Sequence, residues 1–224
     1  MVAVPTGAPP VPCEGYSAMN PWRSLMVLIV ACVVWAAPAA AAEKTPPEQA
    51  AKFMEGLSGE ALAILGAQGV SLDKREADLR ALLSRSFDFQ KIGRFVLGRA
   101  WRTATPEQRD EYQRLFQEFV LRTYSRRLGG YSGQVFKITK VEPMGKIDAV
   151  VVTEIGRPSG PPLKAGWRVR GGAGAFKILD VIVEGVSMLA TQRSEFASVV
   201  RSQGVDGLIE VLRVQVNKFA ARAS

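Results

Sequence analysis

Few side chains in this sequence combine the residue types and the spacing that catalysis requires. Asp180 and Glu184 are four residues apart in a stretch typical of a β-strand, so both carboxylates are expected on one face, about 13 Å apart. That separation is too large for a retaining carboxylate pair and wide for an inverting one. Lys164 and Lys177 have no neighbour that would make either amine an obvious base. Surface charge is the favoured interpretation of all four residues.

The absence of histidine excludes several classes of enzyme. None of the 224 residues is a histidine, which removes Ser-His-Asp and Cys-His nucleophilic systems and most zinc sites. The two cysteines, Cys13 and Cys32, both lie near the N-terminus. We therefore predict no catalytic residue, no metal site and no cofactor.

The N-terminal segment is typical of an export signal. The apolar run from Leu25 to Ala37 is shorter than the ~20 residues that span a membrane. Arg23 precedes this run, and small residues ending at Ala42 follow it, which is the pattern of a cleaved secretory signal peptide. We predict a signal peptide at residues 1–42 and one domain at residues 43–224.

Two details of this segment leave alternatives open. Residues 1–18 lack a basic region, whereas Met19 opens a conventional one, so translation is expected to start at Met19. Ile29 to Cys32 matches a bacterial lipobox, which would acylate Cys32. Because apolar residues continue beyond Cys32, soluble export is favoured over a lipoprotein. Export would remove both cysteines, so the core alone must hold the domain together.

The chain is basic, with 29 Lys and Arg against 21 Asp and Glu and a net charge of +8. Removal of residues 1–42 takes away one acidic and one basic residue and leaves this value unchanged. Such an excess suits an anionic partner. Nucleic acid is the least favoured partner for an exported protein, and a basic surface that only aids solubility is the simpler alternative.

Capping residues and apolar spacing predict helices at both ends of the domain. The predicted N-caps are Thr45, Ser71, Asp88, Thr105 and, in the tail, Asp206. Between these helical regions, β-branched stretches alternate with Gly/Pro turns and predict a four-stranded antiparallel meander. The predicted strands lie at 134–144, 147–156, 163–171 and 175–186. The fold class is therefore α+β, with helices packed on one sheet face.

A series of distinctive motifs extends from about Glu48 to Val216. In the first half they are Phe87-Asp88-Phe89, Leu97-Gly98, Trp101, Pro106-Glu107-Gln108, Phe116, Phe119, Thr123-Tyr124 and Tyr131. In the second half they are Asp180-Val181, Glu184 to Ser187, and Arg193-Ser194-x-Phe196. In order and spacing, these motifs closely resemble the MlaC family of periplasmic lipid-binding proteins. One departure is Gln192, which replaces the aromatic residue that family members often carry at that position.

The resemblance implies an α+β fold that encloses an apolar pocket for acyl chains. It also implies a shuttle that carries phospholipid between an inner-membrane ABC transporter complex and an outer-membrane lipoprotein complex. One lineage of the family is associated with hopanoid metabolism, so a polycyclic lipid is a second candidate ligand. An exported protein-binding scaffold without a ligand is an alternative function, and a carboxylate-based lipid hydrolase is a weaker one.

Strand alternation indicates which residues would line such a pocket. Trp167 and Val169 share one face of their strand, and Val181 and Val183 share a face of the next. Tyr124 ends the apolar stripe of the longest helix, so its hydroxyl is expected at the pocket mouth. The alternative is that all five residues are ordinary core.

The longest helix also supplies the predicted docking residues. Between Ser84 and Leu128 there are ten Lys and Arg residues and only five acidic residues. We predict that Arg122, Arg126 and Arg127 contact the anionic surface of a membrane-bound partner.

Overall fold

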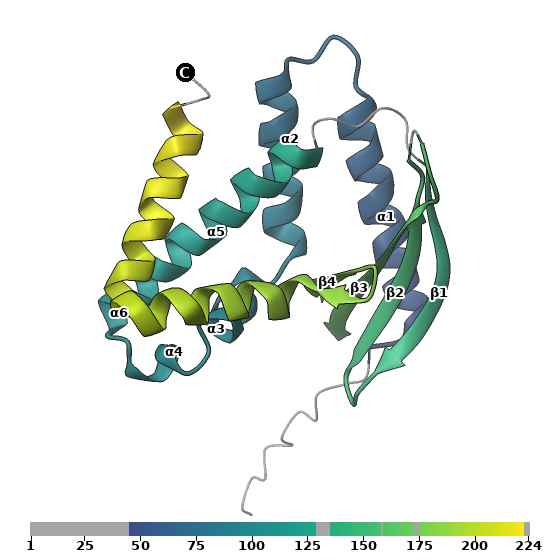
Figure 1. Cartoon of the computed structure of the whole chain (residues 1–224). Coiled ribbons are helices and arrows are strands. Elements are labelled where there is room, and N and C mark those ends of the chain that lie inside the picture. Colours follow the sequence, from purple (N-terminus) through teal and green to yellow (C-terminus); the bar gives the residue numbers. More distant parts are fainter. Residues whose placement is uncertain (1–44, 129–134, 158, 173–174, 222–224) are drawn as a thin grey trace, which may run out of the picture. The chain divides into compact units, whose positions relative to one another are not determined.

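The computed structural model describes residues 45–128, 135–157, 159–172 and 175–221. The predicted signal peptide at residues 1–42 lies outside these described residues. Within them, no helix is both long and apolar enough to cross a membrane. The described part is one α+β unit, which confirms the predicted fold class (Figure 1).

Five helices precede the sheet. They are α1 (Pro47–Gly66), α2 (Leu72–Ser86), α3 (Phe89–Leu97), α4 (Ala100–Thr103) and α5 (Pro106–Leu128). Three predicted N-caps are confirmed, because Ser71, Asp88 and Thr105 each accept a hydrogen bond from a backbone N–H three residues later. Thr105 and Gln108 form a reciprocal capping box.

The predicted cap at Thr45 is wrong. The Thr45 hydroxyl donates to the carbonyl of Ile147 at 2.7 Å and accepts from the N–H of Gly171 at 2.8 Å. These partners are more than a hundred residues away in sequence, so Thr45 attaches the start of the domain to the sheet. Helix α1 begins without a side-chain cap.

The sheet is an antiparallel meander in the order β1-β2-β3-β4-β5. Its strands are β1 (Phe136–Met144), β2 (Asp148–Ile155), β3 (Leu163–Gly172), β4 (Ala175–Val183) and β5 (Val186–Ser187). The prediction of four strands missed β5 because a two-residue strand is too short to show alternation. A tight turn at Glu184 (φ 48°) and Gly185 (φ 82°) separates it from β4.

The C-terminal helix α6 (Met188–Ala221) is interrupted at Gly204, where φ is 71° and ψ is −174°. The two predicted tail helices are therefore two arms joined at this residue, since glycine tolerates a positive φ. Asp206 does not act as the predicted cap. Its Oδ1 accepts from Nε2 of Gln108 at 2.7 Å, which ties α6 to the start of α5.

The buried apolar residues form two clusters. The helical core combines residues of α3, α5 and α6, including Tyr112, Phe116 and Phe196, whose ring centroids are 5.7–6.4 Å apart. The sheet core is formed where α1 packs on the sheet, and its fully buried members include Val151 and Val169. Figure 1 shows α1 alongside the sheet, away from α6.

The opposite face of the sheet carries a buried charge. The Asp148 side chain is only 3 % exposed. Its carboxylate accepts hydrogen bonds from Nε of Arg168 at 2.6 Å and from Nε of Arg170 at 2.5 Å. Burial by itself raises the pKa of Asp148, but the hydrogen bonds and positive charges of Arg170 and Arg168 outweigh it. The pKa of Asp148 therefore lies below its ordinary value.

We predict that Asp148→Asn lowers the free energy of unfolding at pH 7 by ~1–3 kcal/mol, because charge-assisted hydrogen bonds from Arg168 and Arg170 are lost. A folded-state pKa below the unfolded value means that this contribution is complete above about pH 4 and declines as the pH falls through the folded pKa. Urea unfolding of both proteins across the acid range measures the difference. A gap that stays constant down to the lowest pH would contradict the prediction.

Candidate functional site

An apolar cavity lies between the helical core and the sheet core. Its volume is about 380 Å³, within the range of small-molecule sites. Residues of α2, α3, α5, β3, β4 and α6 line it, together with Phe87, which links α2 to α3. Phe87 packs against both cores, so it lies at the boundary between the two separate clusters.

The helical wall of the cavity is almost entirely apolar. Helices α2, α3 and α5 contribute Leu83, Phe89, Ile92, Val96, Phe116 and Val120. Sequence reasoning missed these residues, because a helical stripe that borders a cavity has the same spacing as one that fills a core. Only contact with a second layer distinguishes the two cases.

Four of the five predicted lipid contacts line the cavity: Tyr124, Trp167, Val181 and Val183. Tyr124 is 37 % exposed, so its ring reaches both the cavity and solvent. Val169 is not among the lining residues. It is fully buried in the sheet core, together with Ala50 and Met54 of α1.

The position of the lining residues depends on a β-bulge that the sequence did not reveal. Arg168 pairs with Asp180, but Val169 pairs with Ile178, so Leu179 is the extra residue of β4. This irregularity places Leu179 in the cavity wall as well. The Trp167 indole N–H donates to Oγ1 of Thr153 at 2.9 Å, which fixes the ring against the sheet.

Few polar groups reach the cavity. Asp180 is one, but its Oδ1 accepts from the Leu189 N–H at 3.0 Å and its Oδ2 from the Ser187 hydroxyl at 2.6 Å. Asp180 therefore holds the first turn of α6. Gln192 also lines the cavity and donates to Glu195 at 3.0 Å.

The carboxylate pair suggested by the sequence does not form a shared site. Glu184 lies in the turn after β4, where it accepts from the Lys164 N–H at 3.0 Å and lies 3.7 Å from Arg157. The expectation that Glu184 belongs to the strand with Asp180 is wrong, because β4 ends at Val183. Each carboxylate is engaged in local structure, and the described residues contain no cluster of His, Cys, Asp or Glu that could hold a metal.

The predicted docking residues differ in their surroundings. Arg122 is ion-paired with Glu118, which also lies 3.8 Å from Arg80. Arg126 is exposed and forms no ion pair with any residue that the structure describes. Arg127 belongs to α5, but its side chain lies outside the described part of the chain.

Known proteins are similar to this chain in sequence and in fold. The family model "MlaC protein" matches residues 55–214. The intermembrane phospholipid transport system binding protein MlaC of Haemophilus influenzae is 28 % identical over 126 residues, which cover 54 % of this chain and 59 % of that protein. The solved phospholipid-binding protein of Ralstonia solanacearum, in complex with a phospholipid, is 25 % identical with a TM-score of 0.66, covering 75 % of this chain and 97 % of that chain. The chain belongs to the MlaC family.

Proposed function

We propose that this protein is an exported carrier that binds a phospholipid by its acyl chains. The observation that carries the proposal is the apolar cavity between the two cores, whose lining contains only a few polar side chains. The relatives support it, because one is named as an intermembrane phospholipid transport protein and the other was solved with a phospholipid.

In this proposal the carrier moves lipid through the periplasm between an inner-membrane ABC transporter complex and an outer-membrane lipoprotein complex. Its signal peptide, residues 1–42, is removed on export. Burying acyl chains is favourable by ~0.8 kcal/mol per methylene, and leaving a bilayer costs a similar amount. A cavity whose apolar lining approximates that of a membrane interior allows the lipid to be exchanged in both directions.

A polycyclic lipid of the hopanoid type is the second candidate ligand. Gln192 lines the cavity at the position where family members often carry an aromatic residue. An amide in place of a ring leaves room for a rigid ligand body. Mass spectrometry of organic extracts of protein purified from its native envelope distinguishes the two ligand classes. Recovery of no lipid at all would favour a protein-binding scaffold and overturn the proposal.

We predict that the same Val→Trp substitution has different effects at two positions in the sheet, reducing bound lipid at one and stability at the other. Val183→Trp projects into the cavity, so it should reduce bound lipid severalfold while leaving the stability of the empty protein nearly unchanged. Val169→Trp overfills the sheet core and should lower the free energy of unfolding by ~1–3 kcal/mol. Lipid content by mass spectrometry and urea unfolding of delipidated protein measure the two effects. A full lipid load in a stable Val183→Trp variant would show that the cavity is not the lipid site.

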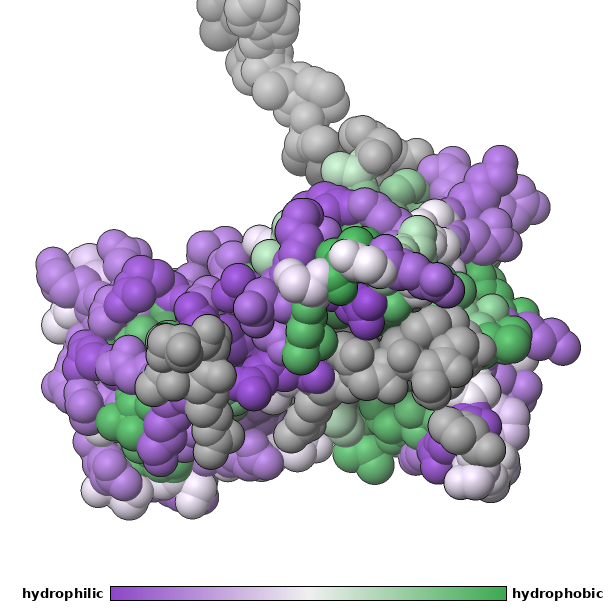
Figure 2. Space-filling view, turned by 90° about the horizontal axis from the view of Figure 1, so that it is seen from above, coloured by the Kyte–Doolittle hydropathy of each residue, from purple (hydrophilic) through white to green (hydrophobic). Residues whose placement is uncertain are grey.

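The docking surface is proposed to act through charge. On the face shown in Figure 2, hydrophilic residues predominate and apolar ones form small separate groups. Arg126 of α5 offers an exposed guanidinium without an ion-pair partner among the described residues. We therefore place Arg126 at the centre of the proposed docking surface of α5, with Arg122 and Arg127 beside it in sequence.

We predict that Arg126→Glu weakens association with vesicles containing anionic phospholipid at low salt, and that the difference disappears as ionic strength rises. Screening shortens the range of the interaction to about 10 Å at 0.1 M salt. Co-sedimentation at several salt concentrations is the measurement. Lys218→Glu, an equal charge change at an exposed site on α6, is the matched control. Equal losses in the two variants would mean that net charge alone, and not the α5 surface, determines association.

A further inference from the structure

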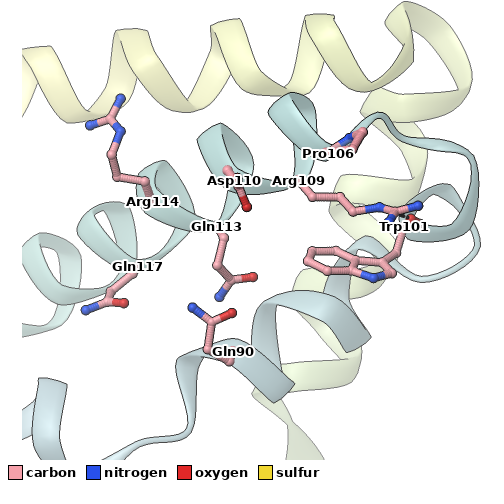
Figure 3. Close-up of a pocket in the computed structure, with 8 residues that line it drawn as sticks. All are labelled: Gln90, Trp101, Pro106, Arg109, Asp110, Gln113, Arg114 and Gln117. Carbon is pink, nitrogen blue, oxygen red and sulfur yellow. Dashed lines mark hydrogen bonds between the residues drawn. The ribbon is translucent and has the colours of Figure 1, made fainter.

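Two arginines of the helical layer pack on aromatic rings, and they differ in what their guanidinium groups bind. Arg109 lies 5.7 Å from the centre of the Trp101 ring and donates to the carbonyls of Trp101 and Arg102 at 2.8 Å and 3.3 Å (Figure 3). Arg193 of α6 lies 4.6 Å from the centre of the Phe95 ring of α3. It forms no hydrogen bond or ion pair with any residue that the structure describes. All of its N–H donors are therefore left for another partner.

The Arg193 guanidinium is held in place by the end of α3. Gly98 follows the last residue of this helix with a φ of 63°. A Cβ at Gly98 would lie 3.3 Å from Nη2 and 3.4 Å from both Cζ and Nε of Arg193. Because these three distances are nearly equal, the flat face of the guanidinium lies over Gly98. Together with the Phe95 ring, this contact sets the orientation of the group before any ligand arrives.

The nitrogens of this guanidinium are open to solvent. The Arg193 side chain is partly exposed, and none of its nitrogens belongs to the buried, unpartnered polar atoms of the described residues. The ordinary role of a cation at the end of a helix is to donate to the last free carbonyls. Arg193 donates to none within the described part of the chain, so capping does not account for it. Packing occupies the flat face, and the N–H groups along the edge remain available.

The segment that holds Arg193 is itself basic. Residues 89–106 contain no acidic residue and four cations, which are Lys91, Arg94, Arg99 and Arg102. Lys91 is paired with Asp88, whereas the three arginines are exposed and form no ion pair with a described residue. Glu195 is the only acidic residue in the first arm of α6, and it accepts from Gln192. The excess of unpaired positive charge favours an anionic ligand.

The site lies beside the wall of the apolar cavity. Phe95 is one turn of α3 beyond Ile92, and Arg193 is one turn of α6 beyond Leu189. Ile92 and Leu189 both line the cavity, as does Gln192, the residue before Arg193. One helical turn advances ~5 Å, so the guanidinium is a short step from the cavity on two of its helices. An amphiphile with its chain in the cavity can place its polar end there.

We propose that Arg193 binds the phosphate group of the phospholipid carried in the cavity, and that Arg94 and Arg99 attract it. This proposal rests on the carrier function proposed above. The edge of a guanidinium presents parallel N–H donors that match two oxygens of a phosphate. An uncharged polycyclic lipid offers no anion to this site. Arg193 therefore makes the carrier select lipids that carry a phosphate over lipids with the same chains and none.

The test offers delipidated protein equal amounts of dioleoylphosphatidylglycerol and dioleoylglycerol, which share their chains and differ in the phosphate headgroup, and measures both by mass spectrometry. Arg193→Gln should lower the ratio of bound phospholipid to bound dioleoylglycerol about fivefold, the upper end for a partly exposed ion pair. Lys52→Gln removes an equal charge at an exposed site on α1 and should leave the ratio unchanged. An unchanged ratio in Arg193→Gln, including an equal loss of both lipids, overturns the proposal. If the unaltered protein takes up neither lipid, the carrier function itself fails, and this proposal with it.

A second measurement identifies the source of the anion. In NMR spectra of ¹⁵N-labelled delipidated protein, sn-glycerol 3-phosphate should shift the Nε–H signal of Arg193 saturably and leave that of Arg109 unchanged. A shift caused only by a short Glu-rich peptide would indicate a protein partner and overturn the proposal. A response to inorganic phosphate combined with an unchanged lipid ratio would overturn the headgroup assignment.

A further variant decides the question if Arg193→Gln does not fold. Arg99→Gln, at an exposed position, should lower the lipid ratio about twofold, because it removes a nearby charge without touching the packed guanidinium. Arg193→Lys keeps the charge and loses the planar donor edge, so it should recover only part of the ratio. Full selectivity in both of these variants overturns the proposal.

Discussion

The separation of the two hydrophobic cores is the constraint on which the rest of the structure depends. Protein interiors are normally packed as densely as organic crystals, and a void loses contacts on every side. Here α1 covers the sheet near Val169, and α3, α5 and α6 form a core of their own around Tyr112. The cavity is the space that remains between them.

That separation persists because polar contacts hold the two halves together at defined points. The Asp88 N–H donates to the carbonyl of Ile178 at 3.1 Å, which attaches the α2–α3 connection to β4. Asp180 binds the first turn of α6 to the same strand. Both bonds lie beside the cavity, so the helical layer is fixed to the sheet along one line and is not packed against it throughout. A void can persist between layers that are joined in this way.

Three acidic residues of the sheet and of its last turn hold parts of the fold together. Asp148 is buried between two arginines, Asp180 holds α6, and Glu184 closes a turn. Each of these three carboxylates accepts hydrogen bonds from neighbouring groups. The cavity provides shape and dryness, which is what transfer of an acyl chain requires.

Much of this architecture follows from local signals in the sequence. The N-caps at Ser71, Asp88 and Thr105 depend on a side chain and the next three residues, and the α+β order depends on helical and strand periodicity. Alternation along β3 and β4 was enough to select Trp167, Val181 and Val183 as residues that share a face. Contacts between neighbours in sequence were therefore predictable.

Tertiary structure decided everything that depends on distant partners. Thr45 and Asp206 have the residue types of helix caps, but each bonds to a group about a hundred residues away. Val169 and Trp167 lie on the same face of β3 by alternation. Nevertheless, Val169 is fully buried in the sheet core with α1, whereas Trp167 lines the cavity. Periodicity shows which side of an element is apolar, whereas the layer that meets it depends on the packing of the whole chain. For that reason the sequence determined the elements and their buried faces, and only the fold decided which buried faces enclose a space.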